Sequence, residues 1–191
     1  MIAGHFGFAA AVKSRAPRAP LWALMLACVW LDVVFVPLFV AGIETIVPLP
    51  GTSGGYGEGV IHADYTHSLL GALLISVAFA LVAAIWWRWS VALVLGAVVF
   101  SHWVLDLPMH HADLPLLPGN AGSLPLLGFG LWRWPAASAL LEIALVLLGT
   151  FLYARAAART AGAGQSSRVR YVTAALLASG FVTLGLNWLN I

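Results

Sequence analysis

Five long apolar stretches constrain the fold of this chain more than any other feature of its sequence. They lie at about residues 21–43, 66–87, 90–107, 136–158 and 170–190. About 20 helical residues cross the ~30 Å hydrocarbon core of a bilayer. The whole chain is 62% hydrophobic and only 8% charged, which is typical of a polytopic membrane protein. We therefore predict an all-α membrane helix bundle of about five transmembrane helices, forming a single integral membrane domain over residues 1–191.

Local signals mark where some of these helices begin. Pro135 suits the first turn of the fourth helix, where its missing N–H costs nothing. Asp64 or Thr66 is a suitable cap for the second helix. The apolar segment at residues 2–12 is too short to span a bilayer, so we expect either an interfacial helix or a re-entrant one. The re-entrant form, which we favour, brings His5 near the level of Asp32.

The basic residues predict the orientation of the bundle. Eight of the nine precede the first stretch or lie in the second–third and fourth–fifth connections: Lys13, Arg15, Arg18, Arg88, Arg155, Arg159, Arg168 and Arg170. Arg133 falls on the other side. The positive-inside rule makes the shared side cytoplasmic, with the N-terminus there. We expect a multi-pass protein of the bacterial inner membrane, and this asymmetry accounts for a pI near 9.0 without nucleic acid as a partner.

Histidines and carboxylates gather at the opposite, outer side. His102 and Asp106 are four residues apart, which places both on one face of a helix. Ionisable groups inside a membrane are costly unless they are paired, so a functional site is the default interpretation. Imidazole and carboxylate together are ligands for a divalent transition metal. The candidate metal ligands are His5, Asp32, His62, His67, His102, Asp106, His110 and Glu142.

The donor set predicts which metal and which roles. Cys28 is the single cysteine, so thiolate sites are excluded and Zn is favoured, with Mn or Fe as alternatives. Asp106 or Glu142 is the candidate bridging ligand or general base, and Asp32 is the candidate for orienting a histidine. His110 and His111 are adjacent, so we expect only one of them to face the site. We expect three other outer carboxylates to be solvated loop charges or interface charges: Glu44, Glu58 and Asp113.

Two stretches of the sequence that contain these candidate ligands resemble a known family. "HADYTHSLLGALL" and "SHWVLDLPMHHADLPLLPG", with their T-H-S-L and S-H-x-x-x-D elements, resemble the bacterial membrane-bound metal-dependent hydrolases, also called LexA-binding inner-membrane-associated hydrolases. "IAGHFGFAAAVKSRAPRAP" and "LLEIALVLLG" extend the likeness over most of the chain. The resemblance implies a metal-dependent membrane hydrolase.

A more distant resemblance concerns the order of the ligands. The set His5, Asp32, His67, His102, Asp106, His110 and Glu142 is similar to the ligand set of zinc-dependent phospholipase C enzymes, which are all-helical and bind three zinc ions. This chain departs from that pattern because it begins with Met1 where those enzymes have a ligating tryptophan, and it lacks their second downstream histidine pair. The resemblance therefore implies one or two ions.

These observations favour a metal-dependent hydrolase, such as a phosphoesterase, acting on a membrane lipid or lipid-linked substrate at the outer face. One alternative is a proton or divalent-metal transporter, in which the same groups form a relay. The inner halves of the second to fifth stretches hold no histidine or carboxylate, which counts against it. A non-haem iron oxidoreductase, which needs two histidines and one carboxylate, is another alternative. A structural or docking role through the outer loops would need no metal.

Overall fold

The computed structural model describes residues 1–52, 55–162 and 164–189. This part of the chain is mostly helical and contains a small antiparallel hairpin. Its elements in chain order are α1 (Ile2–Arg15), α2 (Leu21–Cys28), α3 (Trp30–Val40), β1 (Thr45–Pro48), β2 (Gly59–His62), α4 (Leu69–Ala83), α5 (Trp89–Asp106), the 3-10 turns η1 (Pro118–Asn120) and η2 (Leu131–Arg133), α6 (Pro135–Thr160) and α7 (Ser166–Leu189).

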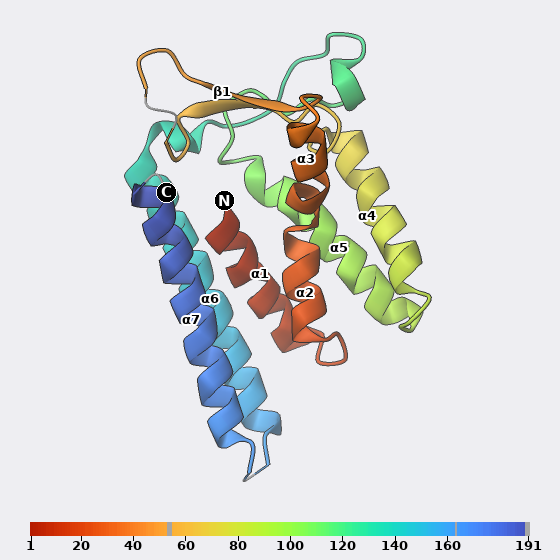
Figure 1. Cartoon of the computed structure of the whole chain (residues 1–191). Coiled ribbons are helices and arrows are strands. Elements are labelled where there is room, and N and C mark those ends of the chain that lie inside the picture. Colours follow the sequence, from red (N-terminus) through yellow and green to blue (C-terminus); the bar gives the residue numbers. More distant parts are fainter. Residues whose placement is uncertain (53–54, 163, 190–191) are drawn as a thin grey trace.

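The helices run alongside one another, and their connections gather at the two ends of the bundle (Figure 1). The α1–α2, α4–α5 and α6–α7 connections lie at one end. The hairpin and the long segment at residues 107–134 lie at the other, which we call the outer end. The basic residues predicted to share one side therefore lie in or beside connections at one end of the structure.

Helix α1 occupies the centre of the bundle. It packs most extensively against α6 and also contacts α2, α5 and α7. Small residues allow this: a Cβ atom added to Gly149 would lie 1.8 Å from the Gly7 carbonyl oxygen, and one on Gly7 would lie 2.5 Å from the Leu145 carbonyl. Two helices that touch backbone to backbone require glycine at the crossing. The first segment is thus buried among helices and does not lie flat along the edge of the bundle.

Within the described part of the chain, three helices are long and apolar enough to cross a membrane: α5, α6, and α7 over Ser166–Leu186. Helices α2 and α3 together make a fourth candidate, which is broken at Val29 and bent by 45°. Helix α4 is apolar but has only 15 residues. Each of the five predicted stretches therefore contains helix. The structure supports a membrane-associated helical protein, and three of its described helices could each cross a membrane alone.

The predicted helix starts are correct in one case and wrong in the other. Helix α6 begins at Pro135, as expected. Helix α4 begins later than predicted, and its cap is Ser68, whose side chain accepts a hydrogen bond from the Gly71 N–H at 3.0 Å. Asp64 and Thr66 do not cap it, because the Thr66 hydroxyl bonds instead to the carboxylate of Glu44.

The β1–β2 hairpin is the one element type that the all-α prediction left out. It pairs Thr45 with His62 and Pro48 with Gly59 in antiparallel register. It lies across the outer ends of the helices, over the segment at residues 107–134 (Figure 1). It contributes part of the wall of the site described next.

Candidate metal centre

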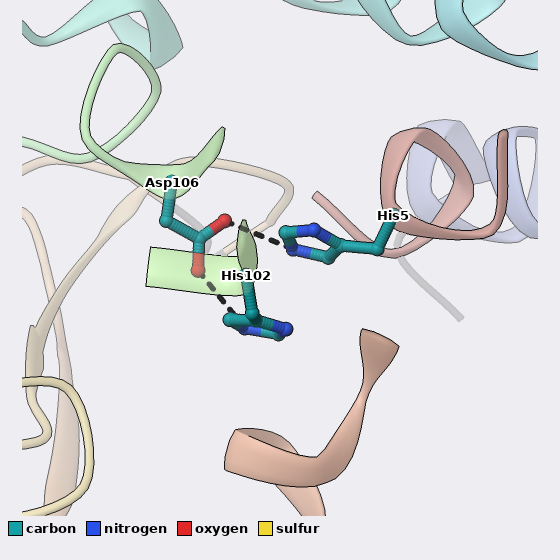
Figure 2. Close-up of side chains that lie close together, drawn as sticks. All are labelled: His5, His102 and Asp106. Atoms are coloured by element: carbon teal, nitrogen blue, oxygen red, sulfur yellow. Dashed lines mark hydrogen bonds and ion pairs between the residues drawn. The ribbon is translucent and has the colours of Figure 1, made fainter. Parts of the chain in front are cut away.

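The centre is built around Asp106, at the outer end of α5. One turn earlier, His102 lies with its Nε2 atom 3.0 Å from Asp106 Oδ2. From α1, His5 approaches the other oxygen, with its Nε2 3.1 Å from Asp106 Oδ1. The rings of His5 and His102 stack with centroids 3.8 Å apart and planes inclined by 16°. Figure 2 shows one carboxylate held between the two imidazoles, which come from helices far apart in sequence.

Asp32 and His67 extend the centre toward α3 and α4. Asp32 Oδ1 lies 3.5 Å from His102 Nε2 and 3.6 Å from His67 Nε2. The Nε2 atoms of His67 and His102 are 3.3 Å apart. His110 Nε2 lies 3.7 Å from Asp106 Oδ2. Two sets of three residues, His5–His102–Asp106 and Asp32–His67–His102, have donor atoms within 4.8 Å of one another, so these clusters could hold a metal ion.

The break between α2 and α3 orients His102. The last carbonyls of a helix lack partners within that helix. The carbonyl of Cys28, the last residue of α2, accepts a hydrogen bond from His102 Nδ1 at 2.8 Å. Because a carbonyl only accepts, Nδ1 of His102 carries a hydrogen, and Nε2 is the nitrogen that faces Asp106 and could bind an ion.

A chain of three residues orients His67 in the same way. The buried carboxylate of Glu44 accepts hydrogen bonds from the N–H groups of Tyr65 and Thr66, both at 2.8 Å, and from the Thr66 hydroxyl at 2.9 Å. The hydroxyl oxygen is then free to accept from His67 Nδ1, 2.9 Å away. This arrangement again leaves the lone pair of His67 on Nε2.

His110 is the third histidine whose ring is fixed by an acceptor. Its Nδ1 donates to Asp113 Oδ1 at 2.9 Å. Asp113 is buried, and its other oxygen accepts the Ile61 N–H of β2 at 2.9 Å. The hairpin is thereby tied to the loop that carries His110.

These three arrangements have one electrostatic consequence. The Nε2 lone pairs of His67, His102 and His110 point at one another or at carboxylate oxygens, over distances of 3.0 to 3.7 Å. Acceptors facing acceptors in a buried site repel unless a proton or a metal cation lies between them. Histidines that donate Nδ1–H to an acceptor and present Nε2 inward are the usual arrangement at protein metal sites.

Glu142 lies beside the centre but outside both sets of possible ligands. Its Oε2 accepts the Gly4 N–H at 3.1 Å, and its Oε1 accepts a short hydrogen bond from the Tyr56 hydroxyl. Burial and the neighbouring Glu142 carboxylate raise the pKa of Tyr56, so this hydroxyl stays protonated and donates at neutral pH. Glu142 therefore caps the first turn of α1 from another helix and holds it in place.

A cavity of about 350 Å³ opens onto the centre. One side is lined by Asp32, His67, His102, Asp106 and His110. Tyr56 and Trp132 of η2 also line the cavity, and the ring centroid of Trp132 lies 4.3 Å from that of His110. The cavity can hold a small polar group against the histidines.

The structure brings most of the predicted ligands together. His5, Asp32, His67, His102, Asp106 and His110 converge. His62 does not: it is exposed at the end of β2. The Nε2–H of His111 donates instead to the Gly57 carbonyl oxygen at 2.9 Å, so His110 is the member of the pair that faces Asp106.

The expectation that Glu44 and Asp113 are solvated is wrong. Both are buried, and each fixes a histidine of the centre. Glu58 is half-buried and accepts the Gly55 N–H at 3.0 Å. The sequence could have indicated the role of Asp113, because it follows His110 by three residues. No local spacing links Glu44 to His67.

Comparisons with protein-family models, with curated proteins and with solved structures found no match for this chain.

Proposed function

We propose that this protein is a metal-dependent membrane hydrolase that cleaves a phosphate ester of a lipid or lipid-linked substrate. In this proposal the apolar helices form five spans of a bacterial inner membrane, with the N-terminus in the cytoplasm and the centre toward the outer face. The positive-inside distribution of Lys and Arg supports this orientation. The resemblance to membrane-bound hydrolases supports the reaction class.

One observation carries the proposal: three histidines whose Nδ1 atoms are held by acceptors turn their Nε2 atoms toward the carboxylates of Asp32 and Asp106. His5, His102 and Asp106 would hold the ion, with His67 and His110 at its edge. Zn fits this set of nitrogen and oxygen donors, and Mn or Fe also do. When bound, such an ion lowers the pKa of a coordinated water and polarises an ester oxygen.

The two carboxylates differ in exposure, and this separates their roles. Asp106 is almost fully buried between histidines, so it serves as a ligand. By contrast, 38% of the Asp32 side chain is exposed, and it lines the cavity. A general base must lie within hydrogen-bond reach of the water that it deprotonates. We assign that role to Asp32, with its oxygen accepting the proton of water.

Metal analysis of the purified protein tests the centre. We expect one to two equivalents of Zn, Mn or Fe per chain when no chelator is used, and loss of the ion in the His102→Ala/Asp106→Ala variant. His62→Ala is the matched control, because His62 is exposed and outside the centre. Wild-type protein that holds no transition metal and gains no thermal stability when one is added would refute the centre.

Phosphate release from phosphatidic acid in vesicles tests the reaction. We expect the metal-loaded protein to release inorganic phosphate. Asp32→Asn should lower the rate by about 10²- to 10⁴-fold, the usual contribution of a general base. The variant should keep the ion that His5, His102 and Asp106 would hold, since these three residues are unchanged. A metal-loaded protein that hydrolyses neither phosphatidic acid nor other lipid esters would refute the hydrolase.

A non-haem iron oxidoreductase is the second candidate, because each set of three contains two histidines and one carboxylate. Metal identity separates the two functions. Iron as the bound ion, together with oxygen consumption and no ester hydrolysis, would favour the oxidoreductase.

A further inference from the structure

The cavity beside the centre has a polar side and an apolar mouth. Ile2 of α1 and Ile46 of β1 both line it, and they are also 41% and 46% exposed on the surface. Residues that line a cavity and reach the surface mark its opening. Phe35 of α3 lines the same cavity, three residues after Asp32. The mouth therefore lies between the first turn of α1, α3 and the hairpin.

The surface around this mouth is apolar as well. From Asp32 to its outer end α3 rises about 12 Å. Over this length α3 exposes a row of apolar side chains: Val33, Val36, Phe39 and Val40. A row of this kind on a helix of a membrane-associated bundle faces lipid.

The partly exposed carboxylate of Asp32 is unfavourable on this apolar surface unless the cavity binds a polar group. More than a third of its side chain is exposed at the mouth, among neighbours that suit hydrocarbon. A carboxylate open to hydrocarbon costs several kcal/mol. A ligand with a polar headgroup and an apolar tail satisfies both parts: the headgroup fills the polar side, and the tail continues past Ile2, Phe35 and Ile46.

We propose that the substrate enters the centre laterally from the outer leaflet, through the mouth between α1, α3 and β1. This inference rests on the function proposed above. The occupant is a membrane lipid with a phosphate-ester headgroup. Its headgroup reaches Asp32 and the histidines, and its acyl chains stay in the bilayer. Ile2, Phe35 and Ile46 then select for lipids over water-soluble esters.

Photolabelling tests the route without requiring hydrolysis. The probe is phosphatidic acid with a diazirine in an acyl chain, in nanodiscs that contain the metal-loaded protein. We expect labelled peptides from the start of α1, from α3 around Phe35, and from β1. Labelling spread evenly over the exposed helices, with α7 labelled as strongly as α3, would overturn the route.

Blocking the mouth tests the same route through activity. Phe35→Cys, in a Cys28→Ser background, is modified with a long-chain alkyl methanethiosulfonate. Val40→Cys is the matched control, because Val40 is on the same helix, is exposed, and does not line the cavity. Since a displaced substrate loses productive positioning, we expect blocked Phe35→Cys to lose about tenfold or more in phosphate release from vesicles, and blocked Val40→Cys less than about twofold.

The outcomes separate the route from the reaction. Labelling at the mouth without phosphate release would refute the hydrolase and support the route. Hydrolysis of glycerol phosphate in solution as fast as that of phosphatidic acid in vesicles would overturn the route and leave the hydrolase intact. Metal content is measured in each variant, and a blocked Phe35→Cys protein that keeps both its metal and its full rate also overturns the route.

Discussion

Helices α1 and α7 are both apolar, yet they occupy opposite environments. Helix α1 has 14 residues, is too short to cross a bilayer, and lies at the centre of the bundle with His5 fully buried. Helix α7 has 24 residues, is long enough to cross, and is exposed along most of its described length. Apolar length therefore indicates partition into the membrane, but it does not indicate which helix is enclosed by protein.

The difference follows from what holds each helix in place. Lipid chains are as apolar as leucine, so a helix such as α7 gains little from packing apolar side chains on its neighbours. Helix α1 has two other sources of attachment. Its Gly7 crosses α6 at backbone contact, and its polar groups bond to Glu142 and Asp106. Small residues and buried polar partners thus determine the enclosed position.

The largest effect should come from the glycine crossing. In Gly149→Ala the added Cβ would lie 1.8 Å from the Gly7 carbonyl oxygen, so α1 and α6 must separate. We expect a loss of about 1–3 kcal/mol or more in unfolding free energy, together with loss of metal, measured by thermal unfolding in detergent and by metal analysis.

The matched control for the crossing is on α7. A Cβ on Gly185 meets no atom within 4 Å, so Gly185→Ala should be neutral or stabilise its helix by up to ~1 kcal/mol. Equal destabilisation by the two substitutions would contradict the contrast between α1 and α7.

The next effect concerns the cap that Glu142 provides for α1. Glu142→Gln keeps the size of the side chain but gives up one of two accepting oxygens and the charge. We expect about 1.5–3 kcal/mol of destabilisation, because hydrogen bonds to a charged group are lost. Tyr56→Phe, which removes only the hydroxyl donor, is the milder comparison. If Glu142→Gln removed the metal without lowering thermal stability, Glu142 would be a ligand rather than a cap.

Asp113 and Glu44 should tune the centre without abolishing it. Asp113→Asn and Glu44→Gln weaken the groups that fix His110 and His67. We expect each to lower metal affinity about 10- to 100-fold, measured by competition with a chelator of known affinity. Glu58→Gln is the control, since Glu58 bonds to the Gly55 N–H. Unchanged affinity in both variants would mean that the ring orientation is set elsewhere.

Much of this arrangement could be predicted from local sequence. Apolar length predicted the helices, and the four-residue spacing of His102 and Asp106 predicted their shared face. The apolar segment at residues 2–12, too short to span, left both an interfacial and a re-entrant position open for His5, and the structure shows the residue buried. The features that could not be predicted depend on contacts between residues far apart in the sequence. Glu44 is buried only because it reaches Tyr65 and Thr66, 21 and 22 residues away.

The broken helix shows the same limit. Pro37 would predict a kink, yet it lies inside α3 and the break is at Val29. No local residue type marks Val29. The break matters because the Cys28 carbonyl beside it meets His102, a contact across 74 residues of sequence.

The smallest effect on the protein, and the sharpest test of how α1 and α7 are placed, comes from single cysteines in a Cys28→Ser background. The connections next to α1 and α7 lie at the same end of the bundle, and the hairpin lies at the other (Figure 1). Arg18→Cys and Gln165→Cys probe the first end, and Thr52→Cys probes the second; all three positions are exposed.

Exposed substitutions should change stability by no more than about 0.5 kcal/mol, so labelling reports position alone. With a membrane-impermeant maleimide we expect Thr52→Cys to react in intact cells, and the other two only after lysis, because the basic residues near them favour the cytoplasm. Reaction of Arg18→Cys and Thr52→Cys from the same side would mean that α2 and α3 together do not cross the membrane. Reaction of both Arg18→Cys and Gln165→Cys in intact cells, with Thr52→Cys reacting only after lysis, would mean that the bundle is inverted and that the centre is at the cytoplasmic face.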